Sequence, residues 1–251
     1  MIEIKNAANI TQPWTRWFFM GDTGSGKSTA AYTFPFPFVI IPSTENSIAS
    51  ARGDDLPYTE AASPIELNQV LVYLEDAYRR STEYLRAEKP DEAWSVFPYQ
   101  TVVLESLTHY TDLIIEELTD GGKKKMDMQQ WGLLSGHLRN IHTRLSNLPV
   151  HVVYTSLAQV KETDGGAVTG GAAMSGAMAL KLPSACDAIG YFEQTPGRAT
   201  KENPNPGMNF RAHFQRYKQF AARIRAPRGV ATPPYVDDFH FDKVKGLFGI
   251  E

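Results

Sequence analysis

Cysteine and long apolar runs are what this sequence most clearly lacks. Its single cysteine, Cys186, excludes an internal disulfide and a cysteine-rich zinc site, so we expect a buried structural thiol. No apolar stretch approaches the roughly 18 residues that a membrane span requires. The six histidines are scattered and form no H-E-x-x-H motif. The sequence therefore predicts neither a histidine or cysteine metal centre nor a membrane partner.

An excess of charge of one sign is lacking too. The 25 lysines and arginines nearly balance 28 aspartates and glutamates, and the net charge of −3 does not by itself favour nucleic acid, which would have to bind local patches. Residues 1–5 lack the basic and then apolar segment of a secretion signal, so we expect a cytoplasmic protein. The composition is that of a globular chain. We expect a single domain over residues 1–251, with a core at about 14–227 and a C-terminal extension at 228–251.

The sequence does contain one complete phosphate-binding motif. Residues 21–28, Gly-Asp-Thr-Gly-Ser-Gly-Lys-Ser, match G-x-x-x-x-G-K-[ST] at every fixed position. The apolar segment 14–20 predicts a buried strand before the motif, and residues 27–33 predict a short helix after it, ended by Pro35. This order directs backbone N–H groups and a helix N-terminus at one anion. We therefore expect ATP and Mg²⁺ as cofactors.

Chemistry assigns roles within this loop. Lys27 would place its ammonium between the β- and γ-phosphates, and Ser28 would hold Mg²⁺. Thr29 either reaches the α-phosphate or is a helix-surface hydroxyl without a ligand. The predicted nucleotide-binding residues are Gly21, Asp22, Thr23, Gly24, Ser25, Gly26, Lys27, Ser28 and Thr29.

Two later strands are predicted to lead into acids. The apolar run 38–41 precedes Glu45, and the run 101–104 precedes Glu105. Because the carboxyl ends of parallel strands share one edge of a sheet, both carboxylates would emerge beside the phosphate loop. We expect Glu105 to contact Mg²⁺ through water, although aspartate is more usual there. Glu45 either orients the attacking water or is a solvated loop residue.

Further segments suggest ligand contacts. A buried strand at 149–156 would end with Thr155 positioned to sense the γ-phosphate. Lys123, Lys124 and Lys125 form a basic loop that would grip DNA phosphates or simply be solvated. The glycine-rich segment 163–178 is expected to be a mobile loop that acts on a ligand, or to be disordered. Residues 210–215 predict an antiparallel edge strand in a terminal hairpin, followed by Arg223 and Arg225, which could reach one phosphate.

Two helices complete the prediction. A capping box at 63–66 starts a long helix, and residues 129–147 form another. The apolar residues expected to face the core from the first helix are Ile65, Val70, Leu71, Leu74, Tyr78 and Leu85. Those expected from the second are Trp131, Leu134, Leu138, Ile141, Leu145 and Leu148.

Taken together, these motifs resemble the RecA-like core ATPases, and in particular a small phage-encoded group of nucleotide-binding proteins associated with single-strand annealing. The resemblance covers about residues 14–227. It implies an α/β fold: a RecA-like P-loop NTPase core with a mainly parallel sheet flanked by helices and a C-terminal antiparallel hairpin. If the chain is phage-encoded, its location would be the host cytoplasm.

The resemblance also implies roles and partners. Glu45 would activate water, loops 121–128 and 164–177 would line a DNA channel, and Arg223 and Arg225 would reach the nucleotide of a neighbouring subunit. The expected partners are single-stranded DNA and further copies of the chain, in a ring or filament with nucleotide at the subunit interfaces.

The leading hypothesis is a DNA-stimulated ATPase of recombination, annealing or repair. A nucleotide-gated loader with a protein partner suits the net charge and the glycine-rich segment equally well. A small-molecule or nucleotide kinase is the other alternative, but residues 163–178, which could form its lid, contain no arginine.

Overall fold

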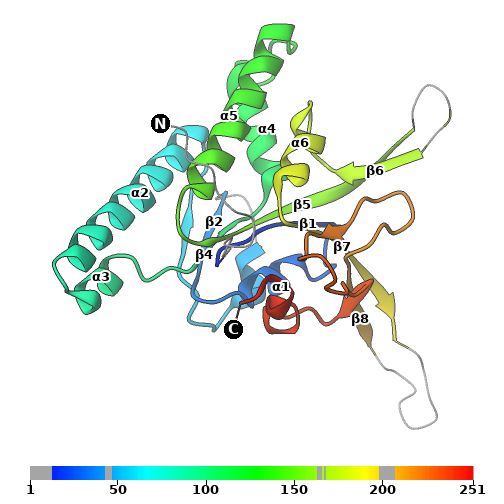
Figure 1. Cartoon of the computed structure of the whole chain (residues 1–251). Coiled ribbons are helices and arrows are strands. Elements are labelled where there is room, and N and C mark those ends of the chain that lie inside the picture. Colours follow the sequence, from blue (N-terminus) through cyan, green and yellow to red (C-terminus); the bar gives the residue numbers. More distant parts are fainter. Residues whose placement is uncertain (1–12, 43–46, 163–165, 167, 198–206, 251) are drawn as a thin grey trace, which may run out of the picture.

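The computed structural model describes residues 13–42, 47–162, 166, 168–197 and 207–250 (Figure 1). Its centre is one sheet with the strand order β10-β8-β7-β1-β5-β4-β2-β3. Six neighbouring strands are parallel: β3 (Tyr58–Glu60), β2 (Pro37–Ile41), β4 (Thr101–Leu104), β5 (His151–Glu162), β1 (Arg16–Gly21) and β7 (Ala188–Pro196). This confirms the predicted mainly parallel α/β sheet.

Antiparallel strands extend the sheet beyond β7. β8 (Met208–His213) pairs with β7 to form the predicted hairpin, and β10 (Tyr235–Asp237) pairs with β8. The prediction that residues 210–215 form an edge strand is therefore wrong, because β10 covers that edge. The short β9 (Arg223–Ile224) pairs with the first residues of β7.

Helices cover both faces of the sheet (Figure 1). One face packs against α2 (Pro64–Arg86), α4 (Leu107–Leu118), α5 (Met128–Ser146) and α6 (Met178–Ala185). The other packs against α1 (Lys27–Tyr32) and the C-terminal 3-10 helices at Phe241–Lys243 and Lys245–Phe248. Since both faces are buried, the strands are continuously apolar; successive residues Phe18 and Phe19 enter opposite clusters.

The prediction that the segment 163–178 is a loop is wrong for residues 168–172, which form a strand, and for Met178, which begins α6; residues 173–177 lie outside helices and strands, as predicted. β6 (Val168–Ala172) pairs antiparallel with the second half of β5 and forms a hairpin arm that projects from the sheet (Figure 1). β5 thus runs six residues beyond the predicted strand end at Ser156. The small side chains of β6 offer little apolar surface for packing. Its strand conformation is instead held by backbone hydrogen bonds to β5.

The two predicted long helices form, with one correction. Ser63 caps α2 by accepting a hydrogen bond from the Glu66 amide at 3.2 Å. The side chains of Ile65 and Leu85, expected in the core, are exposed. The helix buries a stripe with spacings of three and four residues instead: Leu67, Leu71, Leu74, Ala77 and Ser81. The predicted apolar stripe of α5 is confirmed from Leu134 to Leu148, with Trp131 partly buried against it.

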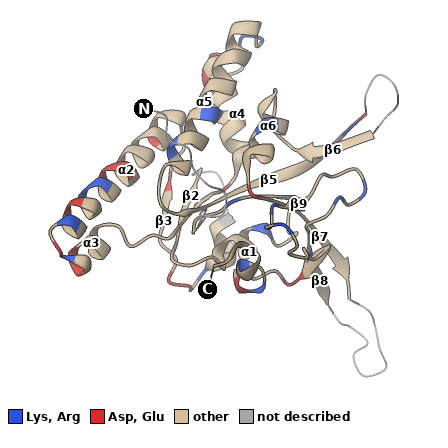
Figure 2. Cartoon of the chain, in the orientation of Figure 1, with Lys and Arg blue, Asp and Glu red and all other residues tan. Residues whose placement is uncertain are grey.

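The outer face of α2 carries mixed charge. Figure 2 shows acidic and basic residues interspersed along it, and Arg79 pairs with both Asp76 and Glu83. α3 (Pro90–Val96) follows after a short break. None of the helices in the described part of the chain has the length and apolar content that crossing a membrane requires.

Candidate functional site

The phosphate-binding motif forms a tight loop between β1 and α1. Gly24 and Gly26 have φ values of +76° and +89°, a backbone conformation that favours glycine. At Gly21 a Cβ would lie 2.3 Å from the carbonyl oxygen of Phe192 and 2.7 Å from Ser25 Oγ. Gly21 is therefore required by close backbone approach, and Gly24 and Gly26 by their positive φ. The predicted strand-loop-helix order is confirmed.

Lys27 points back into this loop. Its Nζ donates to the carbonyl oxygens of Gly21 at 3.0 Å and Asp22 at 2.8 Å, and lies 3.4 Å from Ser25 Oγ. The side chain is only 8% exposed. A buried ammonium on the inner side of an N–H-lined loop suits a multiply charged anion.

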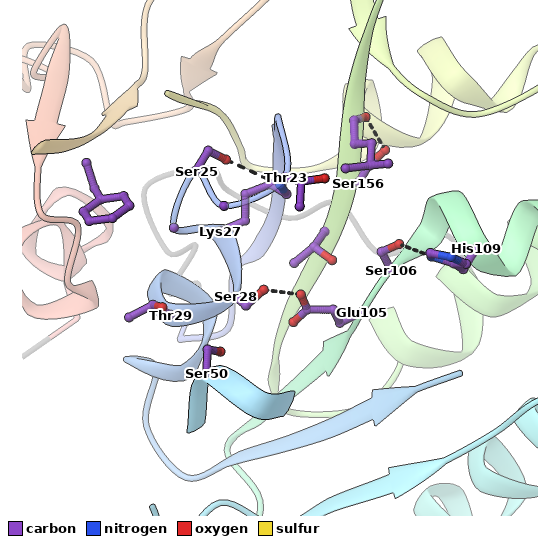
Figure 3. Close-up of a pocket in the computed structure, with 15 residues that line it drawn as sticks. Thr23, Ser25, Lys27, Ser28, Thr29, Ser50, Glu105, Ser106, His109 and Ser156 are labelled. Carbon is purple, nitrogen blue, oxygen red and sulfur yellow. Dashed lines mark hydrogen bonds between the residues drawn. The ribbon is translucent and has the colours of Figure 1, made fainter. Parts of the chain in front are cut away.

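Glu105 is joined to the loop through α1. The Ser28 hydroxyl donates to Glu105 Oε1 (Figure 3). The Tyr32 hydroxyl donates to Oε2 at 3.0 Å. Glu105 follows directly after β4 and is 4% exposed. A hydroxyl and a carboxylate side by side are hard oxygen donors, the kind that Mg²⁺ prefers. The structure thus brings together the two residues predicted to hold the metal.

Thr155 lies on β5 next to the phosphate loop, in register with Phe19 of β1. Its side chain is fully buried, and its Oγ1 has no hydrogen-bond partner among the described residues. The next residue, Ser156, is satisfied by Thr108 Oγ1 at 3.0 Å. A buried hydroxyl without a partner calls for a ligand or water, so Thr155 fits a phosphate oxygen in the cavity that it lines.

These side chains surround one cavity of about 640 Å³. Besides residues 23–29, Glu105 and Thr155, the lining contains residues that the sequence analysis did not assign to the nucleotide site: Ser50, His109, Leu157 and Phe210. His109 lies in the first turn of α4, where Ser106 Oγ is 3.4 Å from its Nδ1 (Figure 3). Its position four residues after Glu105 was a signal that could have identified it. Ser50 and Phe210 carry no such signal: a 3-10 helix at Ser47–Ala51 packs Ser50 beside α1, and the pairing of β8 with β7 brings Phe210 here.

The remaining predicted site residues are either not described or lie away from the cavity. Glu45 is outside the described residues. Lys123, Lys124 and Lys125 are exposed in the connection between α4 and α5, at the free end of a helix pair that projects from the sheet (Figure 1). Within one chain, the structure does not bring these lysines to the cavity.

Arg223 and Arg225 lie at the opposite end of the strands from the phosphate loop, beside the start of β7. Arg223 Nη2 donates to the carbonyl oxygens of Ser184 at 2.8 Å and Cys186 at 3.2 Å. Arg225 Nη2 donates to Ser184 O at 2.7 Å. The two guanidinium groups thus share one acceptor at the C-terminal end of α6. Cys186 is buried, as predicted, and burial raises the pKa of its thiol.

The parallel sheet, the loop and the Ser28–Glu105 pair define a P-loop nucleotide-binding protein. A family model described as an AAA domain matches residues 15–225, most of the chain. The chain therefore belongs to this family of AAA-type P-loop ATPases, which implies nucleotide binding, typically with Mg²⁺. No curated protein matches the sequence.

Proposed function

We propose that this AAA-domain protein hydrolyses Mg²⁺-ATP and couples the hydrolysis to single-stranded DNA in recombination, annealing or repair. The observation that carries the hydrolytic part is the 640 Å³ cavity in which Lys27, the Ser28–Glu105 pair and the Thr155 hydroxyl meet. That hydroxyl has no partner within the part of the chain that the structure describes. Charged, hydroxyl and backbone donors on several sides of one cavity match a triphosphate better than a neutral ligand.

Each residue has a defined task in this proposal. Lys27 and the loop N–H groups hold the β- and γ-phosphates, and Thr155 donates to a γ-phosphate oxygen. Ser28, with Glu105 acting through water, would hold Mg²⁺, which neutralises charge on the phosphate oxygens. Glu45 would orient the attacking water from the segment that follows β2.

The DNA part of the proposal is supported by the lysine loop. Three successive exposed ammoniums suit a phosphate backbone without reading its sequence. α4 begins directly after Glu105 and Ser106 and ends shortly before the lysine loop, so one helix connects the nucleotide cavity with that loop. A change around Glu105 would thus have a direct structural route to the loop.

The test is steady-state ATP hydrolysis with and without single-stranded DNA, at low and at moderate salt. We expect stimulation that fades as salt rises, because lysine-phosphate contacts release counterions. Replacing Lys123, Lys124 and Lys125 by glutamine should remove the stimulation. The matched control replaces three exposed cations on or just after α2, Arg80, Arg86 and Lys89, and should keep it.

Other outcomes identify the alternatives. Hydrolysis that DNA does not stimulate at low salt would overturn the DNA role and favour a loader with a protein partner. Phosphate transfer to a nucleoside monophosphate would favour a kinase. Lys27→Ala should remove nucleotide binding in every case.

We further propose that the protein works as a homo-oligomer in which Arg223 and Arg225 reach a neighbour's nucleotide. The Arg223→Ala variant should then lose hydrolysis. Mixing it with the Lys27→Ala variant should restore part of the activity, because some interfaces would combine the intact phosphate loop of one variant with the intact arginine of the other. Normal hydrolysis by Arg223→Ala alone would contradict the shared site.

A further inference from the structure

A second cavity, of about 590 Å³, adjoins the phosphate site. The two cavities share Gly26, Thr29 and Phe210 in their linings. The second is enclosed by α1, by β7 and β8, and by residues 238–243 of the C-terminal segment. The family match ends at residue 225, so this last wall is supplied by a part of the chain outside it.

The two cavities differ in chemistry. The side chains that suit phosphate and metal, Glu105 and Thr155, line only the first. The second has an apolar interior formed by Ala30, Phe192, Ala212 and Phe239, which are buried, with the half-buried Phe210 between the two cavities. A nucleoside triphosphate has the same division, with a charged chain at one end and a flat, largely apolar base at the other.

We propose that the second cavity holds the nucleoside of the bound triphosphate and that Phe210 contacts its base. This inference rests on the proposed nucleotide binding and deepens it. Thr29, predicted to reach the α-phosphate, lies where the two cavities meet, so the chain of phosphates would pass from the first cavity toward the second at this residue. Because the two cavities adjoin, the second would hold the part of the same molecule that follows the phosphates, which is the nucleoside.

The C-terminal wall is bonded to β8 and to α1 and is braced internally by Lys243. The Asp238 amide donates to the carbonyl oxygen of Phe210 at 2.8 Å, and the Phe241 amide donates to Thr33 Oγ1 of α1 at 2.9 Å. Lys243 Nζ donates to the carbonyl oxygens of Asp237 and Asp238 at 2.8 and 2.7 Å. The pocket is thus preorganised before a ligand arrives, which favours affinity.

The rim favours a nucleoside over further phosphate. Asp238 and Asp242 are exposed at the cavity, and carboxylates accept hydrogen bonds from the amino group of a purine or from ribose hydroxyls. His240 and Lys243 line the same cavity, but the Lys243 ammonium is taken up by the carbonyl oxygens of Asp237 and Asp238, so the exposed carboxylates are what a further phosphate would meet, and they repel it. Residues 238–243, a segment without a sequence motif, would therefore complete the recognition of the nucleoside that Phe210 begins.

The test compares two ligands, ATP and inorganic tripolyphosphate, by calorimetric titration in the presence of Mg²⁺. Phe210→Ala should weaken ATP on the order of tenfold to a hundredfold, the usual effect of losing an aromatic contact to a base. Tripolyphosphate, which has no base, should bind as tightly as to the unmodified protein. The matched control is Phe36→Ala. It removes an exposed phenylalanine just before β2, at the end of the sheet away from the phosphate loop, and should change neither affinity.

Two results would overturn the inference. ATP affinity unchanged in Phe210→Ala would exclude a base contact, and equal weakening of both ligands would mean that Phe210 only supports the loop at Gly26, where a Cβ would be 3.1 Å from its ring. If Phe210→Ala does not fold, Phe210→Leu and Asp238→Asn give the same comparison. Failure of both ligands to bind the unmodified protein would refute the proposed function itself, and with it the nucleoside pocket.

Discussion

The stability of this protein should depend on pH through one buried histidine. His151, the first residue of β5, is 2% exposed and is surrounded by the rings of Trp14, Phe34 and Phe241. The Thr15 amide donates to its Nδ1 at 3.1 Å, so this nitrogen must be unprotonated. Burial lowers the pKa of His151 from 6.5 to about 4.

The sign and size of the effect follow from proton linkage. Between about pH 6.5 and pH 4 the unfolded chain binds a proton at His151 that the folded chain does not, so the free energy of unfolding falls as the pH is lowered. For these two pKa values the loss between pH 7 and pH 5 is about 2 kcal/mol, and it approaches about 3 kcal/mol below pH 4.

The assay is urea unfolding followed by tryptophan fluorescence, at several pH values from 7 to 5, for the unmodified chain and His151→Asn. Asparagine offers an acceptor to the Thr15 amide but does not titrate in this range. The variant should be less stable at pH 7, and the difference between the two proteins should shrink by about 2 kcal/mol at pH 5. Parallel stability curves across this range would refute the assignment of a buried neutral imidazole.

Three substitutions test the phosphate site. Gly21→Ala should abolish ATP binding and lower the free energy of unfolding by about 1–3 kcal/mol, because its Cβ would collide with the Phe192 carbonyl; Gly136→Ala, which meets nothing within 4 Å, should bind ATP normally in the same titration. Thr155→Val should raise the stability of the nucleotide-free chain by about 1 kcal/mol in a thermal melt, because it removes a buried hydroxyl that is unpaired among the described residues. It should also slow hydrolysis, and a loss of stability would contradict this account. Glu105→Gln should still bind ATP but lose hydrolysis on the order of 100-fold in a phosphate-release assay.

The sequence was sufficient to predict those parts of the site whose residue pattern lies within one short segment. The phosphate loop fixes its glycines, lysine and serine within eight residues, and the short apolar runs before Gly21 and Glu105, rich in aromatic or β-branched residues, favour buried strands. The parallel order of those strands then brought Ser28, Glu105 and Thr155 to one edge, as expected. These parts of the site were predictable because their positions follow from strand ends.

The glycine-rich hairpin shows why other parts were not predictable. At Gly170 a Cβ would lie 2.6 Å from the ring of Phe220, a residue fifty positions further along the chain. This glycine is therefore explained by a distant packing contact, whereas composition alone suggested a loop. Phe210 became a cavity residue for a similar reason, through the register of β8 on β7 and the covering of both by the C-terminal segment.

The position of Arg223 and Arg225 restricts how copies of this chain could share a nucleotide. Both lie beside the start of β7, whereas the phosphate loop follows the end of β1, so the two regions occupy opposite ends of parallel strands. In an isologous dimer, residue i of one copy contacts residue j of the other and j contacts i, so a two-fold dimer could join these two ends only if its interface ran the length of the strands. The proposed ring or filament joins them by head-to-tail packing, and in either case the arginines would have to leave the Ser184 carbonyl that they now share. A protein that hydrolyses ATP fully as a monomer would exclude this role for the pair.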